Sequence, residues 1–165
     1  THIDKEGNRQ YPYILHLSPS GAVERIIYAL LEKASMETKA GRVPFFPLWL
    51  SPTQVRLIPV SADQLEYCMN LLSKFDGIRV DMDDTDDSLN KKIRKAEKEW
   101  VPYIAVVGIK EVESGKLNVR MRTSKEKVNM TVEELREKIL SETRGRPFQP
   151  LSLPKLISKR PGFRR

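Results

Sequence analysis

The sequence predicts an α/β fold in which a mixed sheet of about five strands is flanked by three helices and preceded by a further strand and helix. Two observations predict this fold. Short apolar, β-branched runs alternate with amphipathic helical patterns between residues 54 and 143, and this alternation is typical of a sheet with helices on both faces. Residues 103–107 (YIAVV) are apolar without interruption, which is the pattern of a strand buried on both faces.

The first part of the chain contains one strand pattern and one helix pattern. Residues 1–10 are polar and turn-like, and Tyr11–Leu17 is a strand candidate. Residues 19–21 (PSG) break it, and Ala22–Ala34 then has its apolar residues at helical spacing. Because one strand and one helix cannot close a hydrophobic core, we expect this part to be the end of a larger domain whose earlier part lies upstream.

Composition divides the chain into four predicted segments. The second is rich in proline and aromatic residues and is interpreted as a rigid, packed linker. The segments are the end of a larger domain (1–40), the linker (41–52), an α/β domain (53–143) and a proline-rich basic arm (144–165).

From residue 54 the predicted order is strand, helix, strand, helix, strand, strand and helix. Ser61 is a plausible N-cap for the first of these helices. Thr131 and Glu134 form a capping-box pattern at the start of the last. The predicted elements are Val55–Val60, Ala62–Phe75, Ile78–Met82, Ser88–Trp100, Tyr103–Val107, residues 117–122 and Val132–Thr143.

The last two predicted strands are joined by residues 113–115 (ESG), which have turn chemistry. Apolar and polar residues then alternate, so one face of the final strand packs inward and the other presents Asn118, Arg120 and Arg122. Guanidinium groups on a rigid sheet can bind phosphate or stack on unpaired bases. The alternative is a merely solvated strand face, since polar residues commonly point outward from half-buried strands.

The formal net charge of +7 is concentrated near the C-terminus. The chain has 29 basic and 22 acidic residues, and residues 144–165 contain seven of the basic residues and none of the acidic ones. This segment also carries four prolines, which exclude a long helix or a central strand. We interpret it as an extended basic arm that attracts a polyanion, with a disordered tail as the alternative.

Several observations narrow the class of protein. No apolar run is long enough to span a membrane, and the sequence does not start with a signal peptide. The single cysteine, Cys68, allows no internal disulfide, so we expect a reducing, cytoplasmic location and no membrane partner. The acidic run 81–87 (DMDDTDD) does not match an EF-hand, because Asp86 stands where glycine is needed and Lys92 where glutamate is needed.

A strand followed by Ser20-Gly21, with Glu24-Arg25 opening an apolar helix, resembles motif 3 of class II aminoacyl-tRNA synthetases. This resemblance implies that Arg25, with Gly21 before it, binds ATP. In that family the motif-3 arginine lies over the adenine and reaches the γ-phosphate. A cation stacks favourably on an aromatic base and neutralises phosphate, so the chemistry fits. A helix-surface arginine beside Glu24 is the alternative.

His16 lies on the predicted strand shortly before Gly21. An isolated histidine is more often an ordinary core or surface residue. However, threonyl-tRNA synthetases carry a catalytic zinc with a histidine ligand at this place, and His16 is similar to it in position. The resemblance implies that His16 is a zinc ligand and that the other two protein ligands, a cysteine and a histidine, lie earlier in the family's chain. An open site with three protein ligands suits binding of a substrate to zinc.

The element order after residue 54, with the sequences of residues 101–103 (VPY) and 110–116 (KEVESGK), resembles the anticodon-binding domain shared by the histidyl, glycyl, threonyl and prolyl enzymes. Residues 47–55 resemble the junction before that domain in threonyl-tRNA synthetases. The resemblance predicts anticodon contacts from Arg120, Glu111 and Asp86, with Trp100, Asn118 and Arg122 as further candidates. Lys91, Lys92, Arg144 and Arg146 are predicted to contact the tRNA backbone. Asp86 replaces an asparagine of the family, and an ionised aspartate only accepts hydrogen bonds.

The resemblance implies tRNA anticodon recognition within a class II ligase that activates threonine with ATP and transfers it to tRNA(Thr). It implies ATP, Mg²⁺ and Zn²⁺ in the full enzyme and a homodimer formed through the catalytic domain. Motifs 1 and 2 are missing, so we expect neither aminoacylation nor a tightly bound cofactor from this chain alone. Two alternatives are the same module in a prolyl- or glycyl-tRNA synthetase and a non-catalytic RNA- or DNA-binding accessory subunit. The accessory subunit would need neither Arg25 nor His16.

Overall fold

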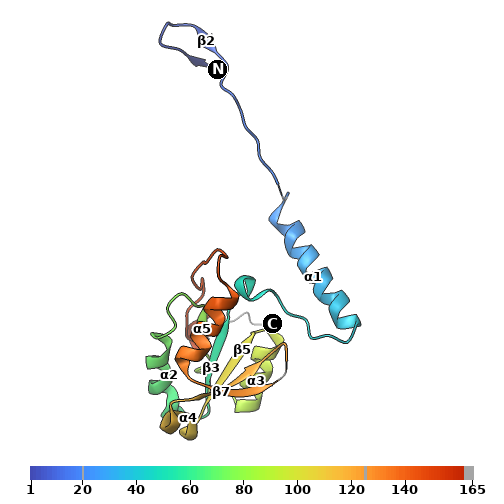
Figure 1. Cartoon of the computed structure of the whole chain (residues 1–165). Coiled ribbons are helices and arrows are strands. Elements are labelled where there is room, and N and C mark those ends of the chain that lie inside the picture. Colours follow the sequence, from blue (N-terminus) through green and yellow to red (C-terminus); the bar gives the residue numbers. More distant parts are fainter. Residues whose placement is uncertain (20, 125, 162–165) are drawn as a thin grey trace. The chain divides into compact units, whose positions relative to one another are not determined.

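The computed structural model describes residues 1–19, 21–124 and 126–161. The chain divides into two compact units, Thr1–Lys33 and Ala34–Arg165. In the first unit, β1 (His2–Ile3) and β2 (Arg9–Gln10) pair antiparallel. Helix α1 (Val23–Lys39) begins in this unit, as the helical spacing predicts, and continues into the second (Figure 1).

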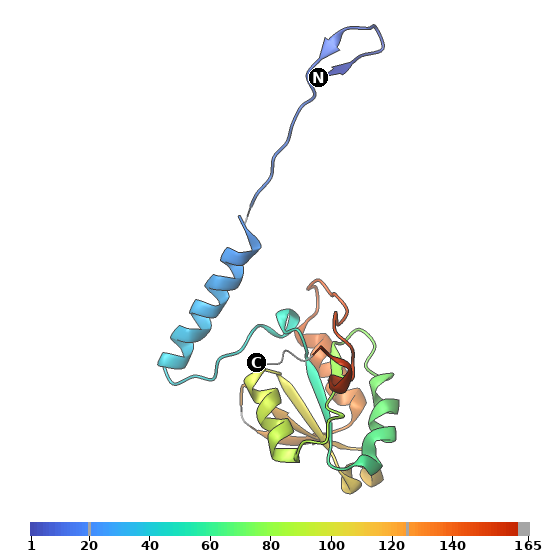
Figure 2. The same ribbon diagram turned by 180° about the vertical axis from the view of Figure 1, so that it is seen from behind.

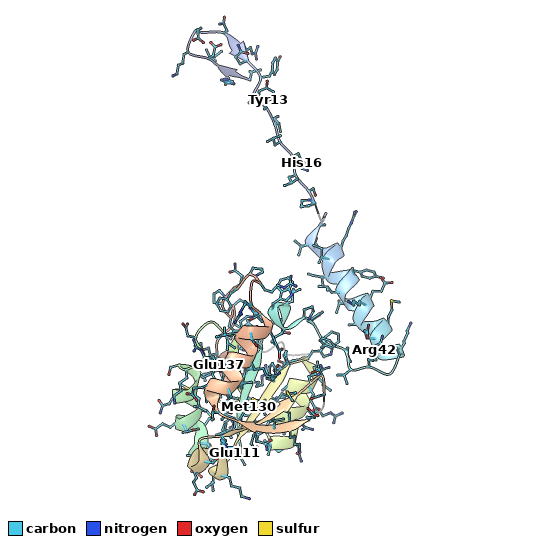
Figure 3. The ribbon with its side chains drawn as sticks, in the orientation of Figure 1. Tyr13, His16, Arg42, Glu111, Met130 and Glu137 are labelled. Carbon is cyan, nitrogen blue, oxygen red and sulfur yellow. The ribbon has the colours of Figure 1, made fainter. Side chains whose placement is uncertain are left out.

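The predicted strand Tyr11–Leu17 is wrong. These residues belong to no strand, and all of them are exposed. Figure 3 shows Tyr13 and His16 projecting from this single extended stretch. A strand needs a neighbour for its backbone N–H and C=O groups, and no described segment of Thr1–Lys33 pairs with this one. The pattern therefore identifies an apolar segment, but the ladder that would make it a strand is absent from the described residues.

The second unit is built on a mixed five-stranded sheet with the order β4-β3-β5-β6-β7. The central strand β3 runs parallel to β4 and β5, whereas β6 runs antiparallel to β5 and β7. The strand bounds are β3 (Val55–Pro59), β4 (Val80–Met82), β5 (Tyr103–Val107), β6 (Leu117–Met121) and β7 (Lys127–Met130). The predicted mixed α/β fold is confirmed.

Helices cover both faces of this sheet, as predicted. Helices α2 (Leu65–Leu72) and α5 (Val132–Glu142) pack on one face, and α3 (Leu89–Lys98) packs on the other. Figure 1 has α5 in front of the sheet, and Figure 2, from behind, has α3 in front. The remaining helices are η1 (Leu48–Leu50), η2 (Ala62–Gln64), α4 (Ile109–Ser114) and η3 (Ile157–Lys159). No described helix combines the length and apolar character needed to cross a membrane.

The main core lies between the sheet and the α2/α5 layer. Leu57 and Val119 point into it from the strands, and Leu71 and Leu135 from the helices. Alternation of side chains places the next residue of each strand on the α3 face, where Ile58 and Ile104 meet Ala96 of α3 in a smaller cluster. We refer to these two sides of the sheet as the α2/α5 face and the α3 face.

Two parts of the 103–130 region differ from the prediction. A helix, α4, stands where a turn is predicted; it ends at Gly115, which has a φ of 67°. The helix buries no residue, so it lacks the apolar periodicity that reveals a helix in a sequence. Strand β7 is absent from the predicted elements and has only Met130 buried, so it also shows little pattern. Gly108 is the N-cap of α4, and its N–H donates to the Glu111 side chain at 2.9 Å.

The described part of the predicted basic arm, residues 144–161, belongs to the second unit and contacts its sheet. Leu156 forms a parallel bridge with Met82 of β4, and the short helix η3 follows. Arg79 donates to the Gln149 carbonyl at 3.2 Å and lies over the Phe148 ring. Prolines exclude a long helix here, as predicted, but they do not prevent an extended segment from lying on a sheet edge. Residues 162–165 lie outside the described part, and they include Arg164 and Arg165, the last two basic residues of the predicted arm.

Candidate nucleic-acid interface

A groove of about 390 Å³ opens on the α3 face between the C-terminal half of α3 and strand β6. Its floor is apolar and its walls carry four cations and one carboxylate. The lining residues are Val43, Arg94, Glu97, Lys98, Val101, Ile104, Arg120, Met121 and Arg122. An apolar floor with cationic walls can hold the flat face of an unpaired base while the walls approach phosphate.

Arg120 reaches this groove from a rigid position. It pairs across the ladder with Ile104 of β5 and Lys127 of β7. Its side chain is 34% exposed, and Nη1 lies 3.6 Å from the Glu97 carboxylate. That separation is too long for a strong hydrogen bond, so most of the guanidinium donors remain available to a ligand. Two residues earlier on β6, Asn118 donates its side-chain amide to the Asn129 side-chain oxygen at 3.2 Å and continues the row of polar side chains on this face.

Arg122 and Trp100 are engaged within the protein. Arg122 donates Nε to the Pro44 carbonyl at 2.7 Å and Nη1 to the Glu97 carbonyl at 2.6 Å. Its guanidinium also lies 5.9 Å from the Trp100 ring, which in turn packs on Phe46. Burial lowers the pKa of Arg122 below its ordinary value. These contacts join the linker to the end of α3, so both residues shape the groove wall.

A second hollow of about 220 Å³ lies where β3 and β4 end, between η2 and the acidic loop that precedes α3. Asp86 is exposed at its rim. The carboxyl ends of parallel strands at a reversal of strand order are a common place for ligands in α/β proteins, and β3 is such a strand because β4 and β5 flank it. Glu111 lies at the same edge, since Gly108, which it caps, also approaches Val60 of the hollow.

The basic residues of α3 have unequal roles. Lys91 and Lys95 both pair with Asp87, and these hydrogen bonds, that of Lys91 first, lower the pKa of Asp87 to about 2. Lys91 remains largely exposed. Lys92 is only 7% exposed and donates Nζ to the Asp83 carbonyl at 3.2 Å. The prediction that Lys92 contacts the tRNA backbone therefore has no support in this geometry.

The other predicted site residues line neither hollow. Arg144 and Arg146 are exposed, with Arg146 placed 5.7 Å over the Trp49 ring. In the first unit, Gly21 has a φ of +69°, and Arg25 lies beside it. His16 is exposed, and the described residues contain no group of three His, Cys, Asp or Glu side chains arranged to hold a metal ion.

Sequence reasoning overlooked two residues of the groove, Arg94 and Lys98. They stand four residues apart on α3 and therefore share a face with Glu97 between them. The sequence shows that this helix is basic, but composition does not distinguish Lys92, whose side chain is buried, from Arg94, which lines the groove. The helical spacing relative to the buried Ala96 was the signal that could have separated them.

The sequence profile of a family described as an anticodon binding domain matches residues 54–142, which contain the second hollow and every lining residue of the groove except Val43. The chain belongs to this family. Asp86, Lys91, Trp100, Glu111, Arg120 and the other α3-face residues fall inside the anticodon-binding domain, whereas His16, Gly21, Arg25, Arg144 and Arg146 fall outside it.

Curated relatives agree with this assignment. The chain is 55% identical to a threonine--tRNA ligase of Thermococcus gammatolerans and 52% identical to one of Pyrococcus furiosus, each over 99% of this chain. It spans only 26% and 27% of the length of these relatives. The resemblance to threonyl-tRNA synthetases predicted from the sequence is confirmed.

A solved structure supports the same conclusion. The RNA binding domain of threonyl-tRNA synthetase from Cryptosporidium parvum Iowa II matches with a TM-score of 0.63 and 27% identity, over 79% of this chain and 30% of that chain. A prolyl-tRNA synthetase of the same organism matches with a TM-score of 0.52 over 59% of this chain and 22% of that chain. Together with the curated relatives, this favours the threonyl enzymes over the prolyl alternative.

Proposed function

We propose that this chain is the anticodon-reading part of a threonine–tRNA ligase and that its α3 face binds unpaired anticodon bases of tRNA(Thr). The single observation that carries this proposal is the groove between α3 and β6, which combines an apolar floor with cations from two rigid elements inside an anticodon-binding domain. Unpaired bases are recognised by stacking and by hydrogen bonds to their edges, and this groove offers surfaces for both.

Within this proposal Arg120 reads a base edge, because it projects from a strand and retains free donors. Arg94, Lys98 and Lys91 contact the backbone, and Arg144 and Arg146 extend this contact along the chain. Asp86 and Glu111 act at the hollow beyond β3. Asn118 belongs to the reading surface, while Arg122 and Trp100 hold its wall in place.

The remaining parts of the proposal concern the whole protein. Residues 1–40 form the end of a class II catalytic domain, residues 41–52 the linker, and residues 53–143 the anticodon-binding domain, followed by the arm at 144–165. In the catalytic domain Gly21 and Arg25 bind ATP with Mg²⁺. The exposed apolar side chains of α1, among them Val23, Ile27 and Leu31, support a packing surface for further chain.

The fit of zinc to this chain is partial. His16 offers an exposed imidazole, a normal zinc ligand, but one imidazole cannot hold the ion. His16 would therefore supply one of the protein ligands, and the bound ion would present a Lewis-acidic position to threonine. The proposal for the whole protein includes threonine and ATP as substrates, a homodimer formed through the catalytic domain, and a cytoplasmic location. It assigns no aminoacylation to this chain alone.

Binding to anticodon-swapped transcripts tests the proposal. The protein and its variants are titrated at fixed salt against tRNA(Thr) and against the same tRNA carrying a proline or glycine anticodon in place of its threonine anticodon. We expect the threonine anticodon to bind most tightly. We expect Arg120→Ala to weaken it by about 1–3 kcal/mol and to relax discrimination at one base.

Lys138→Ala provides the control, because it removes one cation from α5 on the opposite face, where Lys138 pairs with Glu142. It should leave discrimination unchanged. Equal affinity for every transcript would remove anticodon reading from the proposal. Tightest binding of the proline or glycine anticodon would favour the corresponding alternative enzyme.

A further inference from the structure

The C-terminal residues 151–161, which we call the strap, run along the free edge of strand β4 (Figure 2). The Met82 N–H of β4 donates to the Lys155 carbonyl at 2.8 Å, and Met82 bridges Leu156 in parallel. The strap therefore satisfies backbone groups that an edge strand would otherwise leave open. It lies beyond residues 54–142, to which the anticodon-binding family corresponds.

A buried ion pair anchors the end of the strap. Arg160 donates Nη2 to the Asp81 carboxylate at 2.7 Å and Nε to the Pro154 carbonyl at 2.9 Å. Asp81 has no exposed side-chain surface and also accepts two hydrogen bonds from Arg56 and one from Thr53. Charge-assisted hydrogen bonds of this kind are stronger than neutral ones. The Arg160 guanidinium is thus committed to the sheet.

A second anchor reaches the acidic loop itself. Ser158 donates its N–H to one oxygen of Asp84 at 2.8 Å and its hydroxyl to the other. Partial burial acts to raise the pKa of Asp84, but these hydrogen bonds lower it below the ordinary value. Asp84 lines the same hollow as Asp86, two residues further on.

Helix α3 holds the loop at both of its ends. Lys92 binds the Asp83 carbonyl, and Asp87 pairs with Lys91 and Lys95. Residues 83–87 are therefore fixed by α3 at Asp83 and Asp87 and by the strap at Asp84, with Asp86 exposed on the segment between.

We infer that the strap is a latch that sets the position of the loop 83–87, and that Ser158 and Arg160 are positioning residues for anticodon reading by this loop. The part that concerns reading rests on the proposed function. The strap acts through its contacts to Asp81 and Asp84, not through attraction to phosphate.

Two variants separate these mechanisms. Ser158→Ala removes the hydroxyl bond to Asp84 without changing charge, and Arg160→Lys keeps the charge but loses the planar fork that reaches both Asp81 and Pro154. Lys159→Ala is the matched control, since it removes an exposed cation between the two anchors. All variants are made in the full 165-residue chain.

The first measurement is amide hydrogen exchange of residues 82–88. We expect exchange there to become about tenfold faster in Ser158→Ala and Arg160→Lys, and unchanged in Lys159→Ala, because local opening loses a stabilising hydrogen bond. The second is binding of cognate and anticodon-swapped tRNA over a range of salt. We expect both anchor variants to lose at least about half of the wild-type discrimination, with the slope of log K against log salt unchanged.

Unchanged exchange in both anchor variants would overturn the latch, whatever the tRNA results. Faster exchange with full wild-type discrimination would overturn the positioning role. A reduced salt slope in Lys159→Ala, with unchanged exchange in both anchor variants, would assign the strap to phosphate binding and also overturn the inference. If wild type itself binds all transcripts equally, the proposed function fails, and hydrogen exchange still decides whether the latch exists.

Discussion

The two faces of the sheet are built from different chemistry. On the α2/α5 face the strands contribute mainly apolar side chains to the core, including Leu57, Val80 and Val119. On the α3 face the same strands present Arg56, Asp81 and Arg120 one residue away. Apolar burial is non-directional and stabilises the fold without fixing any one geometry, whereas paired charges have defined directions. The comparison indicates that one face packs mainly by apolar contact, whereas the other combines a smaller apolar cluster with directed charge pairs.

The α3 face carries a cost for this arrangement. Arg56 and Asp81 both have 0% exposed side-chain surface, and Arg56 Nη1 has no hydrogen-bond partner among the described residues. Buried ion pairs often contribute little net stability, because desolvation offsets their attraction. Removing only one partner of such a pair nevertheless lowers the stability strongly, because the other charge is left buried and unpaired.

Asp81→Ala should have the largest effect. It leaves the buried Arg56 guanidinium without its carboxylate and detaches Arg160, so we expect a loss of about 3–5 kcal/mol in the free energy of unfolding. Urea denaturation followed by circular dichroism measures it. The control is Asp76→Ala at an exposed position, which should change stability by no more than about 0.5 kcal/mol. A loss below about 1 kcal/mol for Asp81→Ala would mean that the network relaxes or hydrates, and the contrast between the faces would weaken.

Leu135→Ala on α5 tests the apolar face. Leu135 is fully buried in the main core, and its truncation should cost about 2–5 kcal/mol in the free energy of unfolding. Leu140→Ala, on the exposed side of the same helix, should cost less than about 1 kcal/mol. At a temperature where Leu135→Ala stays folded, its tRNA discrimination should match wild type. A specific loss of discrimination would show that the α2/α5 face affects tRNA recognition as well as stability.

Arg122→Lys should have a smaller effect on stability, about 1–2 kcal/mol, because lysine cannot reach both the Pro44 and Glu97 carbonyls and stack on Trp100 together. Tryptophan fluorescence should change, since the guanidinium lies over the Trp100 ring. Arg144→Lys, at an exposed position, serves as control. Unchanged fluorescence and stability would indicate that Arg122 is free for tRNA and does not hold the groove wall.

Asp87→Asn should have the smallest effect and a defined pH dependence. The pKa of Asp87 is about 2 in the folded protein and about 3.9 in an unfolded chain. A lowered folded-state pKa contributes stability that is fully present above about pH 4 and is lost as the pH falls toward 2. The difference in Tm between wild type and Asp87→Asn should therefore be present at pH 7 and vanish near pH 2. It should also shrink in 1 M salt, because the pairs with Lys91 and Lys95 are solvent-exposed. A difference that persists at pH 2 would contradict an ionic origin.

Much of the domain is predictable from local sequence. The uninterrupted run at 103–107 predicts a central strand, and β5 is one. The alternation after residue 116 correctly separates Val119 from Arg120, and Thr131 with Glu134 forms the predicted capping box. These features succeed because strand and helix periodicity, and the unpaired groups of a helix end, involve residues within a few positions of each other.

The outcome for the N-terminal strand, α4 and the strap depended on tertiary structure. Tyr11–Leu17 has a strand pattern but pairs with no described segment, and α4 forms without a buried face. The composition of residues 144–161 indicates a basic arm, yet contacts of residues 151–161 make a strap on β4.

Local sequence was therefore sufficient for most of the element order between residues 54 and 143, for the inward and outward sides of the predicted strands and for the resemblance to threonyl-tRNA synthetases. It did not determine which charged residues are free. Lys92 and Arg94 look alike on α3, and Arg160 looks like any basic tail residue, but its partner Asp81 lies 79 positions earlier. Whether a charge is buried and paired or open to a ligand depends on such distant partners and on desolvation. Only the folded chain brings those together.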